Sequence, residues 1–130
     1  MSEGFTKNTA LPTVRGLHYQ VLVGLSKCFD LKEGQTIFFE RDGDVSLIGN
    51  KEDSTQVEVK HYKNDLTDNH LNFWKTLANW TTEEFDHNQY SSLVLLTTQK
   101  FGSSTILKDW NDSNAEKRYE ILCSINAGNK

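Results

Sequence analysis

The stretch Gln56-Val57-Glu58-Val59-Lys60 carries an amide, a carboxylate and an ammonium group at alternating positions. Side chains of a β-strand alternate between its two faces, so the two valines point one way and the three polar side chains point the other. Valines suit a hydrophobic core, whereas unpaired charge is costly to bury. The polar face is therefore either ordinary solvated surface or a site. A carboxylate in such a site is of the kind that holds a divalent cation.

A second carboxylate precedes this stretch. Asp44 lies fourteen positions before Glu58 and opens the preceding predicted strand. Glu40 and Asp42 compete with it as the first carboxylate. Asp44 can also be no more than a turn residue after that signal. The choice between Asp44 and Glu40 as first carboxylate stays open at this point.

The elements that position these residues follow from hydrophobic periodicity. Leu17, Val21 and Leu25 recur at helical spacing and predict a first helix, with Pro12 just before it. The continuous apolar run 92–97 predicts a strand buried on both faces, and a helix before it allows a right-handed crossover, so this strand should run parallel to the third. The expected order is a helix over 13–29, strands over 35–40, 44–48 and 55–62, a helix from Thr67 or Asp68 to Trp80, a strand over 92–97, and closing helices over 104–110 and after a capping box, Ser113 to Glu116.

Composition limits the alternatives. A chain of 130 residues predicts one domain, 1–130, with residues 1–12 loosely ordered and 126–130 a linker. No apolar run approaches the roughly 18 residues that span a membrane, and no signal region begins the chain, so we expect no membrane partner and a cytoplasmic location. Cys28 and Cys123 are isolated and are expected to be reduced, largely buried thiols. The net charge of −4 argues against a simple electrostatic nucleic-acid binder, but a nuclease whose cations offset carboxylates remains compatible with it.

The order αβββαβ, with Glu58-Val59-Lys60 in the third strand, resembles the PD-(D/E)XK nuclease superfamily. The residues 15–20 (RGLHYQ), Phe39-Glu40, 56–60 (QVEVK) and 73–77 (FWKTL) with Asn79-Trp80 resemble one branch of it. That branch is the N-terminal double-stranded-DNA endonuclease effector domain of bacterial antiphage systems, including nucleases of cyclic-oligonucleotide signalling and of Lamassu-type complexes. The similarity runs from about Arg15 to Thr98. It implies a three-layer, restriction-endonuclease-like α/β core with a mixed central sheet between helices.

The resemblance also implies a chemistry, the hydrolysis of DNA phosphodiester bonds with Mg²⁺ or, in its place, Mn²⁺. Asp44 and Glu58 are the implied carboxylate ligands of the metal, and the carbonyl oxygen of Val59 is a third. Lys60, about 6.6 Å along the strand from Glu58, would orient the attacking water and stabilise phosphate charge. Gln20, Glu40 and Gln56 are secondary candidates that would line the site.

Partners are implied in the same way: double-stranded DNA, a fused or associated sensor or assembly module, and an oligomeric active form. Two other interpretations compete. One is a catalytically silent fold of the same superfamily used for binding or assembly, and the other is an unrelated α/β regulatory domain whose Glu-x-Lys is coincidental. Outside the site, Phe73, Trp74 and Trp80 are expected to be core anchors, and His61 is expected to pack with the valines.

Overall fold

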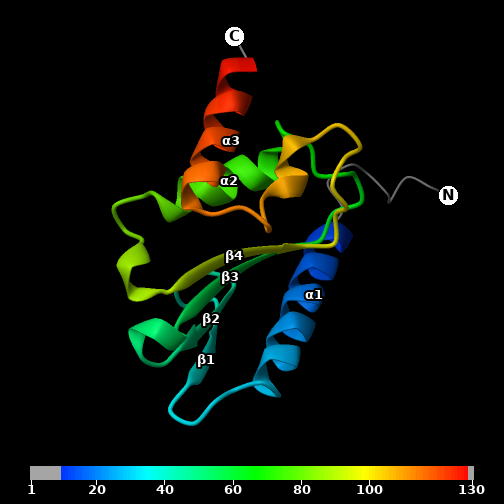
Figure 1. Ribbon diagram of the computed structural model, residues 1–130. Coiled ribbons are helices and arrows are strands. Elements are labelled where there is room, and N and C mark those ends of the chain that lie inside the picture. Colours follow the sequence, from blue (N-terminus) through cyan, green and yellow to red (C-terminus); the bar gives the residue numbers. More distant parts are fainter. Residues whose placement is uncertain (1–9, 129–130) are drawn as a thin grey trace, which may run out of the picture.

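A four-stranded mixed sheet lies between helix α1 on one face and helices α2 and α3 on the other, in three layers (Figure 1). The computed structural model describes residues 10–128. The α/β fold class expected from the sequence is confirmed. The elements in chain order are α1 Leu11–Cys28, β1 Thr36–Phe39, β2 Val45–Ile48, the 3₁₀ turn η1 Lys51–Asp53, β3 Thr55–Lys60, α2 Leu71–Trp80, η2 His87–Gln89, β4 Ser92–Thr97, η3 Ile106–Asp109 and α3 Ala115–Gly128.

The strands lie in the order β1-β2-β3-β4. The first three form an antiparallel meander, and β4 pairs parallel to β3 with Thr55 opposite Ser92 and Lys60 opposite Thr97. Both the meander and the parallel fourth strand are as predicted. The crossover through α2 makes the parallel pairing possible, because parallel neighbours need a long connection.

Each face of the sheet has its own hydrophobic core. On the α1 side the core is Val23 with the strand valines Val45, Val57 and Val59. On the other side, residues of α2, η3 and α3 pack together with Leu66 from the β3–α2 connection. Alternation along β3 therefore buries the odd-numbered valines under α1 and directs the even-numbered polar side chains toward α2. The buried members of the second core are Leu66, Phe73, Leu107, Ile121 and Ile125.

The fourth strand has the predicted bounds, but the first three strands and α2 are shorter than the sequence predicts. Asp44 lies just outside β2, and β3 ends at Lys60, so His61 is exposed instead of packed among the valines, although its ring contacts that of Tyr19. The N-cap of α2 is His70, whose Nδ1 accepts the Asn72 N–H at 3.1 Å. Asp68 is not the cap because its carboxylate is used elsewhere, on η3.

The C-terminal part of the fold also differs from expectation. The predicted helix over 104–110 is only the 3₁₀ turn η3. The side chain of Asn114 accepts the Lys117 N–H at the start of α3, while Ser113 donates its hydroxyl to the Asp109 carbonyl, so the predicted capping box does not form. Since α3 continues to Gly128, the first three residues of the predicted linker are helical, and 129–130 lie outside the described residues.

At the other end, the expected loose segment 1–12 is corrected in part, because Pro12 lies in the first turn of α1; residues 1–9 lie outside the described part. Both cysteines are free thiols, but Cys28 is half-buried and Cys123 is exposed.

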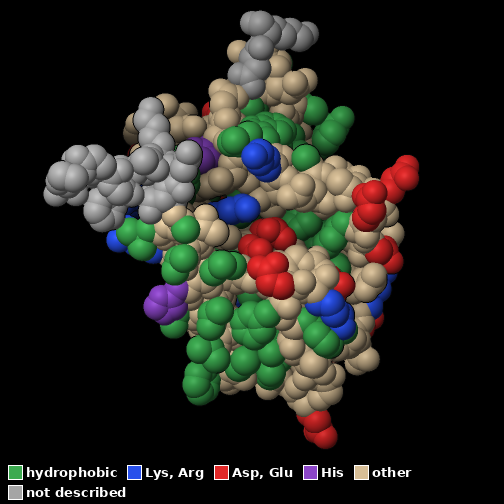
Figure 2. Space-filling view, turned by 180° about the vertical axis from the view of Figure 1, so that it is seen from behind, with side chains coloured by type: hydrophobic (Ala, Val, Ile, Leu, Met, Phe, Trp, Pro, Cys, Tyr) green, Lys and Arg blue, Asp and Glu red, His purple; other side chains and the backbone are tan. Residues whose placement is uncertain are grey.

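No helix within residues 10–128 is long and apolar enough to cross a membrane. The outer side of α1 instead leaves a row of large apolar side chains exposed, and apolar side chains gather on the face seen from behind (Figure 2). They are Leu11, Val14, Leu17, Val21, Leu22 and Leu25.

Asp68 ties the start of the α2 segment to η3. Its Oδ1 accepts the Thr105 hydroxyl and the N–H groups of Ile106 (2.9 Å) and Leu107 (3.4 Å). We expect Asp68→Ala to lower the free energy of unfolding by about 2–3 kcal/mol, because a charged acceptor is removed from several donors. Urea unfolding measures this, with the exposed Asp112→Ala as control, expected within about 0.5 kcal/mol of wild type. Equal losses in the two variants would contradict the role of Asp68.

Candidate functional site

Asp44 and Glu58 meet where β2 begins. The antiparallel register places Val45 opposite Val57 and Ser46 opposite Gln56, so one step further places Asp44 opposite Glu58. Beyond Asp44 the chain turns away into the Glu40–Asp44 loop, and the N–H of Val59 has no strand residue opposite it. The carboxylate of Asp44 takes that place, because its Oδ2 accepts the Val59 N–H at 2.7 Å. A buried N–H needs such an acceptor, which fixes the carboxylate beside β3.

The two carboxylates interact directly. Burial raises the pKa of the Glu58 carboxyl above its ordinary value, the negative charge of Asp44 raises it further, and the hydrogen bond from Gln56 and the positive charge of Lys60 act in the opposite direction. A side-chain contact with Asp44 adds to the upward shift. The protonated form of Glu58 is therefore favoured by its burial and by the neighbouring carboxylate.

Lys60 lies on the same face of β3 as Glu58 and is half-buried. Its charge reaches Glu58, since it lowers the pKa of that carboxyl, yet it forms no ion pair with any carboxylate among the described residues. Its ammonium therefore lies near the two carboxylates without forming an ion pair with either of them. An ammonium in this position can interact with an anion that approaches the pair.

Gln56 is completely buried and is bonded at both ends of its side-chain amide. Its Nε2 donates to Glu58 Oε1 at 3.0 Å, and its Oε1 accepts the indole N–H of Trp80 at 2.8 Å. The sequence left Gln56 open between a site residue and an exposed strand residue, and burial excludes the second. Trp80, expected only as a core anchor, carries a hydrogen bond into the site.

The loop that presents Asp44 is held from α1. Gln20, buried on α1, donates its Nε2 to Glu40 Oε1 at 2.7 Å and to the backbone carbonyl of Asp44 at 3.1 Å. Glu40 itself has a φ of 56°, in the left-handed region, and its N–H also donates to the Asp44 carbonyl. Glu40 is thus directed to Gln20, while Asp44 is the carboxylate beside Glu58. Gln20 positions the loop; its amide nitrogen does not touch the carboxylate pair.

The oxygen atoms at this site suit Mg²⁺. Within residues 10–128 no group of three or more His, Cys, Asp or Glu side chains could hold a metal ion, so the protein offers two carboxylates and, beyond them, backbone oxygen. The N–H and C=O of one residue in an extended strand point to the same side, so the Val59 carbonyl lies on the side on which its N–H meets Asp44. Mg²⁺ keeps several waters and is usually held by one or two carboxylates. Asp44, Glu58 and the Val59 carbonyl are therefore the groups that would hold such an ion.

Two residues of the site were not recognised as such in the sequence, Gly43 and Trp80. Gly43 was assigned only a turn, yet it has a φ of +146°, and a Cβ there would lie 2.0 Å from Gln56 Nε2 and 2.8 Å from Glu58 Oε1. The backbone of Gly43 therefore packs directly against the Gln56 amide and the Glu58 carboxylate. Trp80 could have been suspected because an indole N–H that leaves water needs an acceptor. No sequence signal indicates that the acceptor is Gln56.

Comparison with known proteins adds no family to these observations. No family model, no curated protein and no solved structure matches this chain. Function is therefore inferred from the geometry around Glu58.

The space over Gly43 gives a test of this geometry. Gly43→Ala is expected to destabilise the fold by about 3 kcal/mol, because a methyl group must displace the Gln56–Glu58 pair and the backbone conformation disfavours a side chain. Gly16→Ala is the matched control, since α1 leaves open space at that position and alanine is the better helix former by about 1 kcal/mol. In thermal and urea unfolding, the stability of the fold should fall in Gly43→Ala and rise in Gly16→Ala. A neutral Gly43→Ala would show that the loop does not pack on Gln56.

The raised pKa of Glu58 predicts how stability depends on pH. Its ordinary value is 4.5, and the folded-state value is higher, so the folded state favours the protonated carboxyl. Relative to Glu58→Gln, which cannot ionise, wild type should lose stability as pH rises from below 4.5 through the folded-state pKa, and the loss should be complete above it. Urea unfolding in EDTA across this range measures the difference between the two proteins. A wild type that gains stability relative to Glu58→Gln with rising pH would reverse the sign and contradict the crowded pair.

Proposed function

We propose that this chain is a metal-dependent endonuclease domain that hydrolyses phosphodiester bonds of double-stranded DNA, with Mg²⁺ as cofactor and Mn²⁺ as its substitute. One observation carries the proposal: Asp44, just before β2, and Glu58 on β3 come together, and Lys60 follows Glu58 on the same face without an ion-pair partner among the described residues. Two carboxylates can hold the cation that assists hydrolysis of a phosphodiester, and a nearby ammonium can offset charge on the phosphate.

Each residue has a part that follows from its surroundings. Asp44 and Glu58 would hold the cation, because each carboxylate keeps further acceptor positions beside the one N–H that it accepts, from Val59 and from Gln56 respectively. The bound cation supplies charge neutralisation at the phosphate and a nucleophilic water. Lys60 orients that water and offsets the charge that develops on the phosphate oxygens. Gln20 keeps Asp44 in place through the loop.

Electrostatics supports the same reading. The chain has a net charge of −4, and Asp44 and Glu58 face one nearby lysine. Without a cation this site repels a phosphate, and with a divalent cation it attracts one. A metal requirement therefore reconciles an acidic chain with a polyanionic substrate. The limited positive charge also favours a partner module that supplies part of the DNA-binding surface.

The biological setting is proposed from the sequence resemblance over residues 15–98. It favours a cytoplasmic effector of antiphage defence that works with a fused or associated sensor or assembly module. Cutting both strands of a duplex takes two sites, so we propose an oligomeric active form. The exposed apolar row on the outer side of α1 supports association, because apolar patches of this kind are typical of interaction surfaces (Figure 2).

Substitutions at Lys60 and Glu58 separate metal binding from cleavage. Lys60→Ala is expected to lower plasmid cleavage by at least about 100-fold, the scale of a lost acid–base or electrostatic group, while calorimetry gives an unchanged Mn²⁺ affinity. Glu58→Ala should lose both cleavage and Mn²⁺ binding, because it removes a metal oxygen. The exposed Lys63→Ala is the matched control and should behave as wild type.

The assay compares cleavage with Mg²⁺, with Mn²⁺ and with EDTA over a range of protein concentrations. If the active form is an oligomer, the rate should rise more steeply than linearly with protein concentration. Cleavage that resists EDTA, or full activity in Lys60→Ala, would place the chemistry elsewhere. Absence of cleavage together with absence of Mn²⁺ binding in wild type, at all concentrations, would overturn the proposal.

A further inference from the structure

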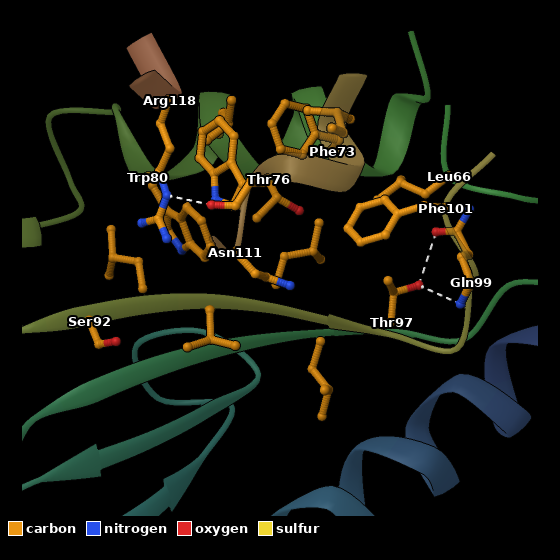
Figure 3. A pocket seen from close by; sticks show the side chains of 17 residues that line it. Leu66, Phe73, Thr76, Trp80, Ser92, Thr97, Gln99, Phe101, Asn111 and Arg118 are labelled. Atoms are coloured by element: carbon orange, nitrogen blue, oxygen red, sulfur yellow. Dashed lines mark hydrogen bonds between the residues drawn. The ribbon is translucent and has the colours of Figure 1, made fainter. Parts of the chain in front are cut away.

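Trp80 stands between a cavity and the carboxylate site. It is the last residue of α2, and its ring lines a cavity of about 600 Å³ between β4 and the helices. Figure 3 shows Trp80 among the side chains that line this cavity. Its indole Nε1–H is directed to β3, where it donates to Gln56 Oε1 at 2.8 Å. The ring therefore belongs to the helical layer, while its polar atom belongs to the site.

The bond from Trp80 decides which way the Gln56 amide faces. An indole N–H is only a donor, so the amide oxygen must be turned toward it and the amide nitrogen away from it. That nitrogen donates to Glu58 Oε1 at 3.0 Å. The reversed amide would set two donors against each other at Trp80 and two acceptors against each other at Glu58. Because Gln56 is 0% exposed, water is not available to repair either contact.

We propose that Trp80 is a positioning residue for the carboxylate site, which acts through Gln56 to fix the orientation of the Glu58 carboxylate. The inference deepens the proposed function and rests on it in one respect, that Glu58 holds a metal ion. Gly43 completes the arrangement from the loop before β2, since its missing Cβ leaves room for Gln56 Nε2 and Glu58 Oε1. The end of α2 and the loop before β2 thus hold the same two side chains.

The first test is the Mn²⁺ affinity of two tryptophan variants. Trp80→Phe keeps an aromatic ring in the cavity wall and removes the N–H, and Mn²⁺ binding measured by calorimetry should weaken about tenfold, the effect of one lost hydrogen bond in a charged network. Trp74→Phe is the matched control on the same helix, because its indole N–H donates to the backbone carbonyl of Asp68 at 2.7 Å, outside the site. It should destabilise the fold to a similar degree and leave the affinity within about twofold of wild type.

A double-mutant cycle shows whether Trp80 acts through Gln56. Gln56→Met has a similar length and no hydrogen-bonding groups, and alone it should weaken Mn²⁺ binding at least as much as Trp80→Phe. In the Gln56→Met background, Trp80→Phe should cause no further loss, because the connection is already broken. Losses that multiply in the double variant, or an unchanged affinity in Trp80→Phe, would overturn the inference.

A readout without metal separates this inference from the proposed function. In ¹⁵N-labelled protein, the side-chain amide protons of Gln56 should exchange slowly with solvent, and this protection should be lost in Trp80→Phe and retained in Trp74→Phe. If wild type binds no Mn²⁺, the proposed function fails, while loss of protection confined to Trp80→Phe still supports the positioning of Glu58 by Trp80. Equal protection in wild type and Trp80→Phe would overturn the positioning role whatever the metal result.

Discussion

The hydrogen bond from the Val59 N–H to the Asp44 carboxylate is the interaction on which the candidate site depends. It forms because the antiparallel ladder between β2 and β3 ends at the pair Val45–Val57, two residues before Val59, so no β2 backbone carbonyl accepts that N–H. A side chain completes the ladder, and in doing so it brings a carboxylate against Glu58. The crowding of the two acids is thus a consequence of where a strand ends. It is held in place by a backbone group that has no other acceptor opposite it.

The site is costly to fold, and the rest of the structure offsets that cost. Two carboxylates in contact and partly out of water raise the pKa of Glu58, which means that the ionised pair is less stable in the fold than apart. Polar groups with fixed orientation reduce the penalty: Gln56 at Glu58, Val59 at Asp44, and Gln20 at the loop carbonyl. The fold therefore holds the Asp44 and Glu58 carboxylates together although they repel each other. Such an arrangement is typical of functional sites, and a divalent cation would turn the repulsion into binding.

The alternation of QVEVK was enough to predict which side chains of β3 face the core and which face the site, because period two is fixed by strand geometry. The parallel β4 followed from an apolar run after a helix. What the sequence could not supply was the exact end of each element. The carboxylate of Asp44 accepts the N–H of Val59, and that of Asp68 accepts an N–H of η3. Such tertiary hydrogen bonds override local capping and turn preferences. The choice between Asp44 and Glu40 needed the register, which only the folded sheet provides.

The same limit explains why the sequence predicts Trp80 only as a core residue. Helical periodicity places its ring in the apolar layer, and the ring is there, in the wall of the cavity (Figure 3). Its single polar atom follows a different rule, since an indole N–H removed from water takes the nearest acceptor. That acceptor is an amide on the other layer, 24 positions away in the chain, whose second group already serves Glu58. One residue therefore fills hydrophobic space with its carbon atoms and orders a charged site with its nitrogen, and a substitution that separates the two properties can show which of them the site requires.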